Sequence, residues 1–484
     1  MPFCRIKFNL VLKLLSYEKT TVTVCVGTLL ADIIYSFLQH QSKPLDGDLP
    51  GGIVPSHDVR PVLSDPLGFT AIQNDSVYPN PNRYFSHASF YLYFDTVPFL
   101  LQNFLSPITS LYVSAALFKI LVQLILILQL SLLFSKNKFK VYTVLPVALI
   151  ISVFFQTNGF QSEIGIIDQS VSYVFFYAFP MIFLLHYFSP LFRFFLYDEE
   201  LKLTFRGFIF RSLLAFPVCL SSPLQPGIVL IIFLLTVLWL FSVWGIRFYD
   251  RQTNLKIMLY FVPVVLLSVY SLYLGNYNSI AINNQKAISE LYVHLASGIY
   301  ILFTLNISFQ LLFYGIILQL FIFLFSGLFR EDSSMRWIYL FTYLFCLIYI
   351  LLLPLGGYRG YRPEIIRYDT FLPVTLVLIF LFTYGSIQIF MNFQNKKWFI
   401  ISPFVFICLV FAIKDKPGFY QNEAEKAMLI RISADSHQTV LLPYPVQVIS
   451  WQPLMDESSS VLIGKMLFKY HITDKPKVFF CNSK

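Results

Sequence analysis

The chain has 484 residues, of which 57% are hydrophobic and 18% aromatic, whereas only 13% carry a charge. Soluble domains carry about 25% charged residues, so no soluble fold buries this much apolar surface behind so few charges. The net charge of +9 does not indicate a nucleic-acid partner, because the basic residues are spread through short loops. The composition therefore predicts a polytopic α-helical membrane protein.

Apolar runs near the length that crosses a bilayer, about 20 residues, predict about eleven transmembrane helices. The basic start of the chain is like that of a signal peptide, but no clear cleavage site follows, so the first run is expected to remain as a span. The approximate limits of the runs are 20–38, 110–134, 141–156, 171–190, 207–221, 227–245, 257–274, 297–328, 337–354, 371–393 and 398–413.

The distribution of basic residues predicts the sidedness of these spans. With the N-terminus inside, the inner segments hold 18 of the 35 Lys and Arg residues, and every inner loop is basic. This is the pattern of the positive-inside rule. An odd number of spans then places the end of the chain outside. We expect a transmembrane part, 1–413, and a small extracytoplasmic α/β domain, 414–484.

The first outer segment, 39–109, is long and opens with a loop rich in Gly, Pro and Asp. The stretches VRPVLSDPLGFTAI and FYLYFDTVPFLLQNFL within it read as short, partly apolar helices of the kind that lie in the membrane interface. In the C-terminal part, QNEAEKAMLIRISAD predicts a helix with Glu423, Glu425 and Lys426 on exposed faces. TVLLPYPVQVISW, SVLIGKMLFKYH and KVFFC alternate well enough to be strands.

Two acids in PLDGDLPGG, Asp46 and Asp48, follow the first span directly. Carboxylates flanked by glycine can approach a substrate closely, where one serves as general base on a hydroxyl or both hold a divalent metal. Turn-forming Asp and Gly in a solvated loop are the alternative interpretation.

Other candidate residues lie in the first two outer loops. Glu163 and Asp168, in the second loop, are candidates for a further acid across the same cavity. His57, Arg83 and His87, in the first loop, are candidates for holding an anion or moving a proton, although exposed loop residues with no such role are more common. No His spacing typical of a zinc site is present.

Two ionisable residues fall within spans. Asp32 lies in the first span and Lys119 in the second. A buried carboxylate in a membrane is costly, so Asp32 is expected to face protein or water. Lys119 is expected to extend its long side chain to the interface rather than pair within the membrane.

The late outer loop GGYRGYRPEIIRYDT, 356–370, breaks the positive-inside pattern with three arginines, Arg359, Arg362 and Arg367. The planar guanidinium group matches phosphate oxygens with two hydrogen bonds, so a lipid-linked phosphate or pyrophosphate is the expected ligand. Tyr361 stands among these arginines, at the level where interfacial aromatics lie. Pairing with Glu364 and Asp369 is the structural alternative.

This layout resembles the GT-C superfamily of integral-membrane glycosyltransferases, with the protein mannosyltransferase and aminoarabinose transferase branches nearest. The shared features are the long first outer loop with acids near its start, the acids of the second outer loop and the late outer loop with arginines. The resemblance covers the architecture of most of the chain and no diagnostic motif. The sequence departs from the family in reading DGD where several branches have DE, ED or DD.

The resemblance implies inverting transfer of a sugar from a polyprenyl-phosphate donor on the outer face of a bacterial inner membrane. Asp46 or Asp48 would be the base, Glu163 or Asp168 a further acid, and Arg359, Arg362 and Arg367 the ligands of the lipid phosphate. The acceptor is a glycan, a lipid or a protein. A divalent cation, Mg or Mn, is an optional cofactor whose ligands would be Asp46 and Asp48.

Three other classes stay open. An O-antigen polymerase or ligase also has many spans and outer arginines, but usually carries its long outer loop late in the chain. A transporter or flippase of lipid-linked glycans is expected to have more polar residues within its spans. A scaffold protein that has kept the fold without activity is the third class.

Overall fold

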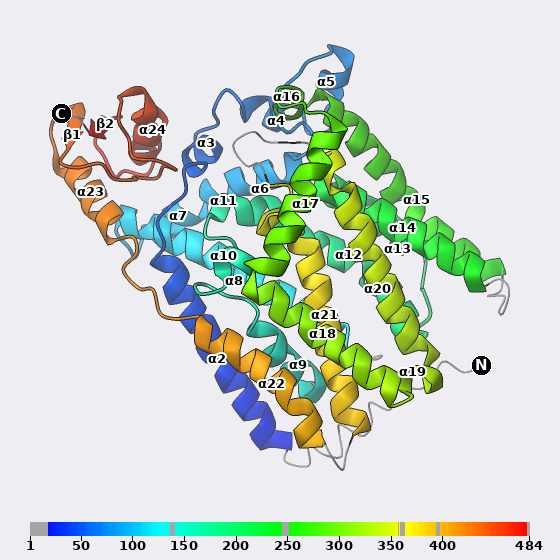
Figure 1. The fold of residues 1–484 in the computed structure, drawn as a ribbon. Coiled ribbons are helices and arrows are strands. Elements are labelled where there is room, and N and C mark those ends of the chain that lie inside the picture. The colour runs from blue at the N-terminus through cyan, green and yellow to red at the C-terminus, as the bar shows by residue number, and fades with distance from the viewer. Residues whose placement is uncertain are drawn as a thin grey trace.

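The protein is a bundle of long apolar helices with loops and a small C-terminal segment, 415–481, gathered at one end (Figure 1). The computed structural model describes residues 18–135, 141–243, 251–356, 358, 364–393 and 397–481. The helices of 18 residues or more are α2 (Glu18–Gln41), α8 (Pro107–Leu132), α12 (Phe179–Tyr197), α14 (Leu224–Val243), α15 (Arg251–Leu274), α18 (Ile307–Phe325), α20 (Ser333–Leu352), α21 (Tyr368–Asn392) and α22 (Lys397–Lys414).

Seven helices of the described chain are long and apolar enough to cross a membrane, which confirms the prediction of a polytopic helical membrane protein. Other predicted spans fall on α14 and α22, which are not among these seven, and on shorter helices, so the number eleven stays a prediction. The span that contains α12 begins earlier in the chain, at Val171. It consists of α11 (Val171–Tyr173), a π-helical turn (Val174–Ala178) and α12. The shorter helices include α9 (Val141–Ser152), α13 (Phe205–Cys219) and α17 (Ile288–Thr304).

The predicted single span at 297–328 is wrong, because the chain there forms two helices, α17 and α18, with a break at Leu305 and Asn306. The Asn306 side chain accepts a hydrogen bond from the Phe309 N–H and so caps α18. The Glu163 carboxylate accepts a second one from the Ser308 N–H. These two acceptors satisfy free N–H groups at the start of α18, so a new helix can begin within the long apolar run.

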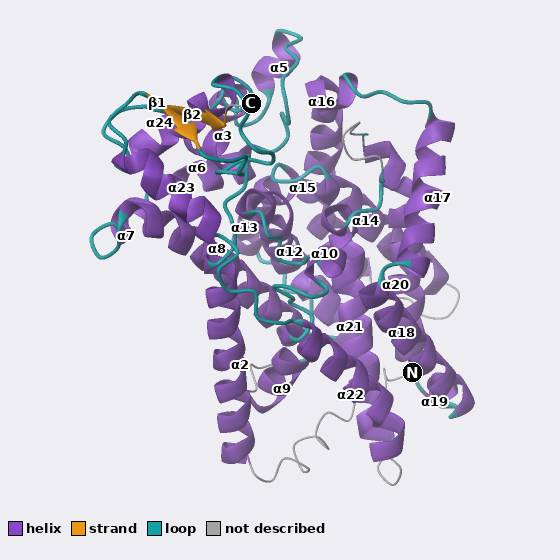
Figure 2. Cartoon of the chain, turned by 60° about the vertical axis from the view of Figure 1, so that its left-hand side comes forward, coloured by secondary structure: helices purple, strands orange, loops and turns teal. Residues whose placement is uncertain are grey.

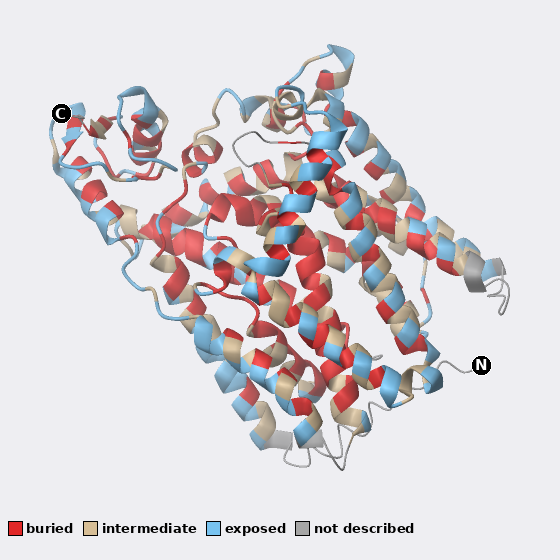
Figure 3. Cartoon of the chain, in the orientation of Figure 1, coloured by how far each residue is buried: buried red, intermediate tan, exposed pale blue. Residues whose placement is uncertain are grey.

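The helices expose residues on the outer faces of the bundle (Figure 3), and many of these exposed residues are large and apolar, as a lipid environment requires. Leu30 and Ile34 on α2, Leu266 on α15 and Phe406 on α22 each expose more than half of their surface. Soluble monomers rarely leave such continuous apolar faces open to water. Most buried apolar residues form one large cluster that continues from the bundle into the C-terminal segment, and a small second cluster joins the first long loop to α15.

Short helices cover the end of the bundle where the C-terminal segment lies (Figures 1 and 2). The first long loop forms short helices in the two apolar stretches where the sequence predicted them, and also α3 (Leu49–Ile53), which was not predicted. The others at this end are α4 (Arg60–Ser64), α5 (Phe69–Gln73), α6 (Tyr84–Phe94), α7 (Val97–Leu101), α10 (Gln161–Ile164) and α16 (Ser279–Ile282). The short helix α19 (Leu328–Glu331) lies between α18 and α20, away from the C-terminal segment (Figure 1).

The C-terminal segment contains α23 (Glu423–Ala434), β1 (Thr439–Leu442), α24 (Val461–Lys469) and β2 (Val478–Cys481). The helix α23 and the strand over KVFFC confirm their predictions. The predicted strand over SVLIGKMLFKYH is wrong, because the stretch is the helix α24. Its buried residues Ile463, Met466, Leu467 and Tyr470 follow the helical spacing rather than an alternation. The helix also supplies the crossover that the parallel β1–β2 pair needs.

Polar contacts fasten this segment to the first two outer loops. The buried Lys43 ammonium group donates to the side chains of Asn158 and Gln421. Burial lowers the pKa of Lys43 to about 8. The Asp415 carboxylate accepts hydrogen bonds from the Thr157 and Asn158 backbone N–H groups. The chain that follows α22 is therefore bound to the first long loop through Lys43 and to the second through Thr157 and Asn158.

Gly464 is expected to be essential for the packing of α24. A Cβ atom there would lie 1.8 Å from the Lys477 carbonyl oxygen, and backbone cannot move aside as a side chain does. Gly464→Ala should destabilise the protein by about 1–3 kcal/mol or more, seen as a lower melting temperature. Gly27→Ala is the matched control, because nothing lies within 4 Å of its Cβ position. A Gly464→Ala variant as stable as this control would contradict the packing described.

Candidate functional site

The first outer loop, the second outer loop and the start of α21 meet in a buried charged cluster. It contains Asp46, Lys119, Asp168 and Asp369, each less than 7% exposed. These residues come from four separate parts of the chain, and three of them are acids. Lys119 lies in α8, Asp168 just before α11 and Asp369 in the first turn of α21, and Figure 1 labels these helices.

Asp46 points into the bundle and binds the start of α11. Its carboxylate accepts a 2.6 Å hydrogen bond from the Ser172 hydroxyl and a 3.2 Å one from the Ser172 N–H. It also accepts the Asp48 N–H. A carboxylate at a helix N-terminus satisfies free N–H groups and is favoured by the helix dipole. Asp46 is thereby held rigidly and shielded from solvent.

Asp168 lies on the other side of the same helix start. Its Oδ1 atom accepts a 2.7 Å hydrogen bond from the Ser170 N–H. Burial raises the pKa of the Asp168 carboxyl to about 7, although the Ser170 N–H and the Lys119 ammonium group favour the charged form. This acid therefore changes its charge near neutral pH.

Lys119 connects the two acids. Its ammonium group is 2% exposed, donates to the Gln169 carbonyl oxygen, and interacts electrostatically with both Asp46 and Asp168. The expectation that this side chain extends to the membrane interface is wrong. A cation inside a membrane protein needs nearby negative charge, and two loops supply it here.

Asp48 points the other way from Asp46, toward the C-terminal segment. It is exposed, and its Oδ1 atom accepts a 3.1 Å hydrogen bond from the Trp451 indole N–H. Gly47, between the two acids, allows the C-terminal segment to come this close. A Cβ atom at position 47 would lie 2.7 Å from the backbone nitrogen of Trp451 and 2.7 Å from its ring. The DGD motif thus joins the bundle on one side and the C-terminal segment on the other.

Another buried carboxylate, Glu425, sets the position of this contact. It accepts hydrogen bonds from the Tyr112 hydroxyl, the Leu45 N–H and the Ile449 N–H. Burial raises its pKa. Ile449 has φ 51°, a left-handed conformation that costs a branched residue about 1–3 kcal/mol. The predicted exposed position of Glu425 is wrong, because its neighbours come from α8 and the first loop, far away in sequence.

Several described residues of the late loop have partners within the protein, and the Tyr358 ring stacks on His294 of α17. The Arg367 guanidinium group donates to both carboxylate oxygens of Asp369, at 3.0 and 3.4 Å. Two of its five N–H groups are used in this way. Asp369 in turn raises the pKa of Asp168 through charge repulsion. Arg359, Tyr361 and Arg362 lie outside the described residues.

The remaining candidates lie elsewhere. Glu163 is part of the α18 cap described above. His57 is exposed, 3.8 Å from the neighbouring Asp58. His87 is buried against Phe176, where burial and then Arg83 lower its pKa to about 3. Arg83 lies over the same Phe176 ring, 5.9 Å from its centre. These two residues therefore contact the π-helical turn.

Metal ligands do not gather in the described chain: it contains no group of three or more His, Cys, Asp or Glu side chains able to hold an ion. Asp46 and Asp48, the predicted ligands, point to Ser172 and Trp451 respectively.

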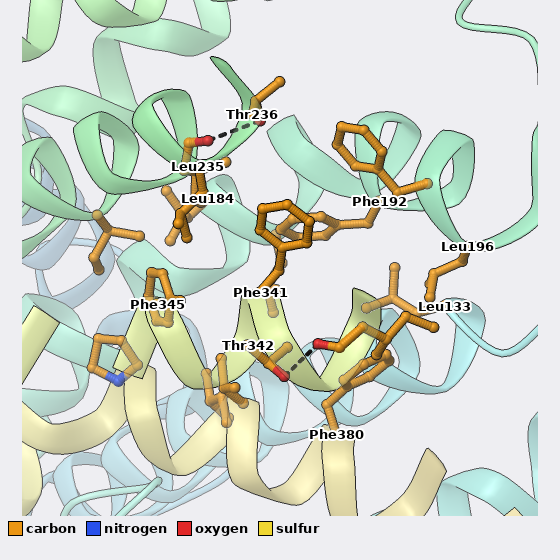
Figure 4. A pocket seen from close by; sticks show the side chains of 18 of the residues that line it. Leu133, Leu184, Phe192, Leu196, Leu235, Thr236, Phe341, Thr342, Phe345 and Phe380 are labelled. Carbon is orange, nitrogen blue, oxygen red and sulfur yellow. Dashed lines mark hydrogen bonds between the residues drawn. The ribbon is translucent and has the colours of Figure 1, made fainter. Parts of the chain in front are cut away.

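An apolar groove of about 250 Å³ lies in the membrane-spanning part, between α8, α12, α14, α20 and α21 (Figure 4). Few polar residues line the groove. Two of them are Thr236 and Thr342, whose hydroxyl groups donate hydrogen bonds to backbone carbonyl groups of their own helices. Along α20 the lining runs from Ser334 to Phe345, about 16 Å. On α21 it begins at Pro373, one helical turn from Asp369, so the charged cluster and the groove are neighbours on one helix.

Sequence reasoning missed Trp451, Glu425 and the groove, and it misjudged Lys119. A lysine in a long apolar run was a visible signal, since intramembrane charge is by default functional. Nothing in the local pattern of the C-terminal part indicated Trp451. Comparisons with models of known protein families, with curated proteins and with solved structures returned no match.

The pKa of Asp168 predicts a pH-dependent stability. In the unfolded chain the carboxyl titrates at about 4, so the folded state holds the proton more tightly and loses stability as pH rises from about 4 to 7. Asp168→Asn cannot ionise. Its free energy of unfolding should therefore rise relative to that of the wild type as the pH increases from about 4 to 7, by a few kcal/mol at about 1.4 kcal/mol per pKa unit, and its melting temperature should rise with it.

Thermal unfolding of the purified protein in detergent measures this difference. Asp75→Asn, at an exposed loop position, is the control whose difference from wild type should stay constant. A pH-independent difference for Asp168→Asn would show that this carboxyl titrates normally.

Proposed function

We propose that the protein is a membrane glycosyltransferase that moves a sugar from a polyprenyl-phosphate donor to an acceptor. The observation that carries this proposal is the charged cluster one helical turn from an apolar groove on α21. An amphiphile with a polar head and a long hydrocarbon chain matches this arrangement. The resemblance to the GT-C layout supplies the reaction, inversion at the sugar, and the outer face of a bacterial inner membrane.

Asp48 is the better candidate for the base that deprotonates the acceptor hydroxyl. It is exposed, whereas Asp46 is buried against Ser172. In this mechanism Asp48 takes the proton of the acceptor hydroxyl, and the acceptor oxygen forms a bond to the anomeric carbon. The bond between that carbon and the phosphate oxygen breaks, and polyprenyl phosphate leaves with the bonding electrons. Asp46 acts as a positioning residue. Arg367 contributes the donors that Asp369 does not use, and Arg359 and Arg362 remain candidate phosphate ligands.

A transporter or flippase of lipid-linked glycans is the second candidate function. Buried Lys119 and His40, both within spans, favour it, because polar residues inside the membrane often mark transport pathways. The O-antigen polymerase or ligase reading shares the chemistry of the first proposal. In that reading the acceptor would itself be a lipid-linked glycan.

Asp48→Asn should reduce sugar transfer about 100-fold or more, which is the usual contribution of a general base. The measurement is incorporation of labelled sugar from polyprenyl-phosphate donors into acceptors in membranes that carry the variant. Asp75→Asn is the control. Undiminished transfer by Asp48→Asn would remove this residue as base, and lipid-linked glycan crossing proteoliposomes without transfer would favour the flippase.

Filling the groove should weaken binding of the donor chain. Val377 lines it, so Val377→Trp is expected to raise the KM for the polyprenyl donor about tenfold with a smaller effect on kcat. Leu347→Trp is the matched control on α20, because Leu347 is 41% exposed on an outer face. Equal KM values for the two variants would show that the groove holds no substrate chain.

A further inference from the structure

Trp451 presents an aromatic surface beside the exposed acid of the DGD motif. Its ring stacks on Tyr173, with 5.6 Å between ring centres and 25° between planes. Its indole N–H donates to Asp48. Even so, Trp451 remains 48% exposed. A large aromatic side chain is thus fixed in orientation and still open to solvent.

The surrounding backbone keeps Trp451 in this place. Glu425 holds the left-handed Ile449 two residues earlier, and Gly47 leaves the space that the Trp451 backbone and ring occupy. Strained backbone persists where the surrounding structure requires it, and such positions gather at ligand sites. Tyr173 directly precedes a π-helical turn, a feature that is also frequent at functional sites.

Sugar rings suit this pair of groups. The face of an aromatic ring is electron-rich, so it attracts the weakly positive C–H groups on one side of a pyranose. A carboxylate at the edge of the ring accepts hydrogen bonds from sugar hydroxyls. An exposed indole next to an exposed carboxylate offers both interactions to one sugar unit.

We propose that Trp451 and Asp48 form a subsite for a pyranose ring of a glycan acceptor. The proposal rests on the proposed transferase function and narrows its acceptor to a glycan. The C-terminal segment then contributes directly to the site, since it carries the ring on which the acceptor sugar stacks. The acceptor hydroxyl lies beside Asp48, the candidate base.

The test measures binding of maltohexaose, cellohexaose and chitohexaose to the purified full chain in nanodiscs. Saturation-transfer NMR and calorimetry report the binding. At least one oligosaccharide should bind the wild type, and Trp451→Ala should weaken its binding at least tenfold. Trp451→Phe keeps a ring and should lose less. Tyr444→Ala is the matched control, since Tyr444 is another aromatic residue of the same segment and is 47% exposed.

Melting temperatures of all variants separate loss of the subsite from loss of the fold, and only variants that melt like the wild type are compared. No binding of any of the three glycans, equal binding by Trp451→Ala, or equal weakening by Tyr444→Ala would overturn the subsite. Trp451-dependent binding without sugar transfer would leave the subsite standing and remove the transferase. Transfer without such binding would remove the subsite alone.

Discussion

A buried ammonium group constrains the end of the molecule where the loops gather. Lys119 lies in the long helix α8 and is almost inaccessible to solvent. An uncompensated charge at such a place is very costly, so the first and second outer loops must bring Asp46 and Asp168 to it. Both acids also bind the N–H groups at the start of α11, which fixes the entry of the next span.

Because of this constraint, the two acids of the DGD motif bind different parts of the protein. Asp46 is committed to the bundle, and the chain then turns at Gly47 to present Asp48 at the surface. The C-terminal segment reaches the same place through Glu425 and Trp451. The candidate base is thus supported by a rigid structure on both sides, as precise positioning of a reacting group requires.

The sequence predicted what depends on composition and local pattern. Apolar runs and residue spacing predict the membrane class, most apolar helices, α23 and the strand β2. The hypothesis that Asp46, Asp48 and Asp168 lie near one another came from their places in two loops. The structure differs where distant contacts decide. Glu425 is buried by α8 and the first loop, and α24 is helical because its buried residues face β2 and the bundle. Such partners are not adjacent in sequence, so no local pattern reveals them.

The hydrogen bond between Trp451 and Asp48 joins residues 403 positions apart. Asp48 is therefore synthesised before the helices from α8 to α22, and Trp451 is synthesised after them. The stretch that carries Trp451 lies between β1 and β2, which pair with each other. The contact between Asp48 and Trp451 can therefore form only after all the helices between them in the sequence have been synthesised.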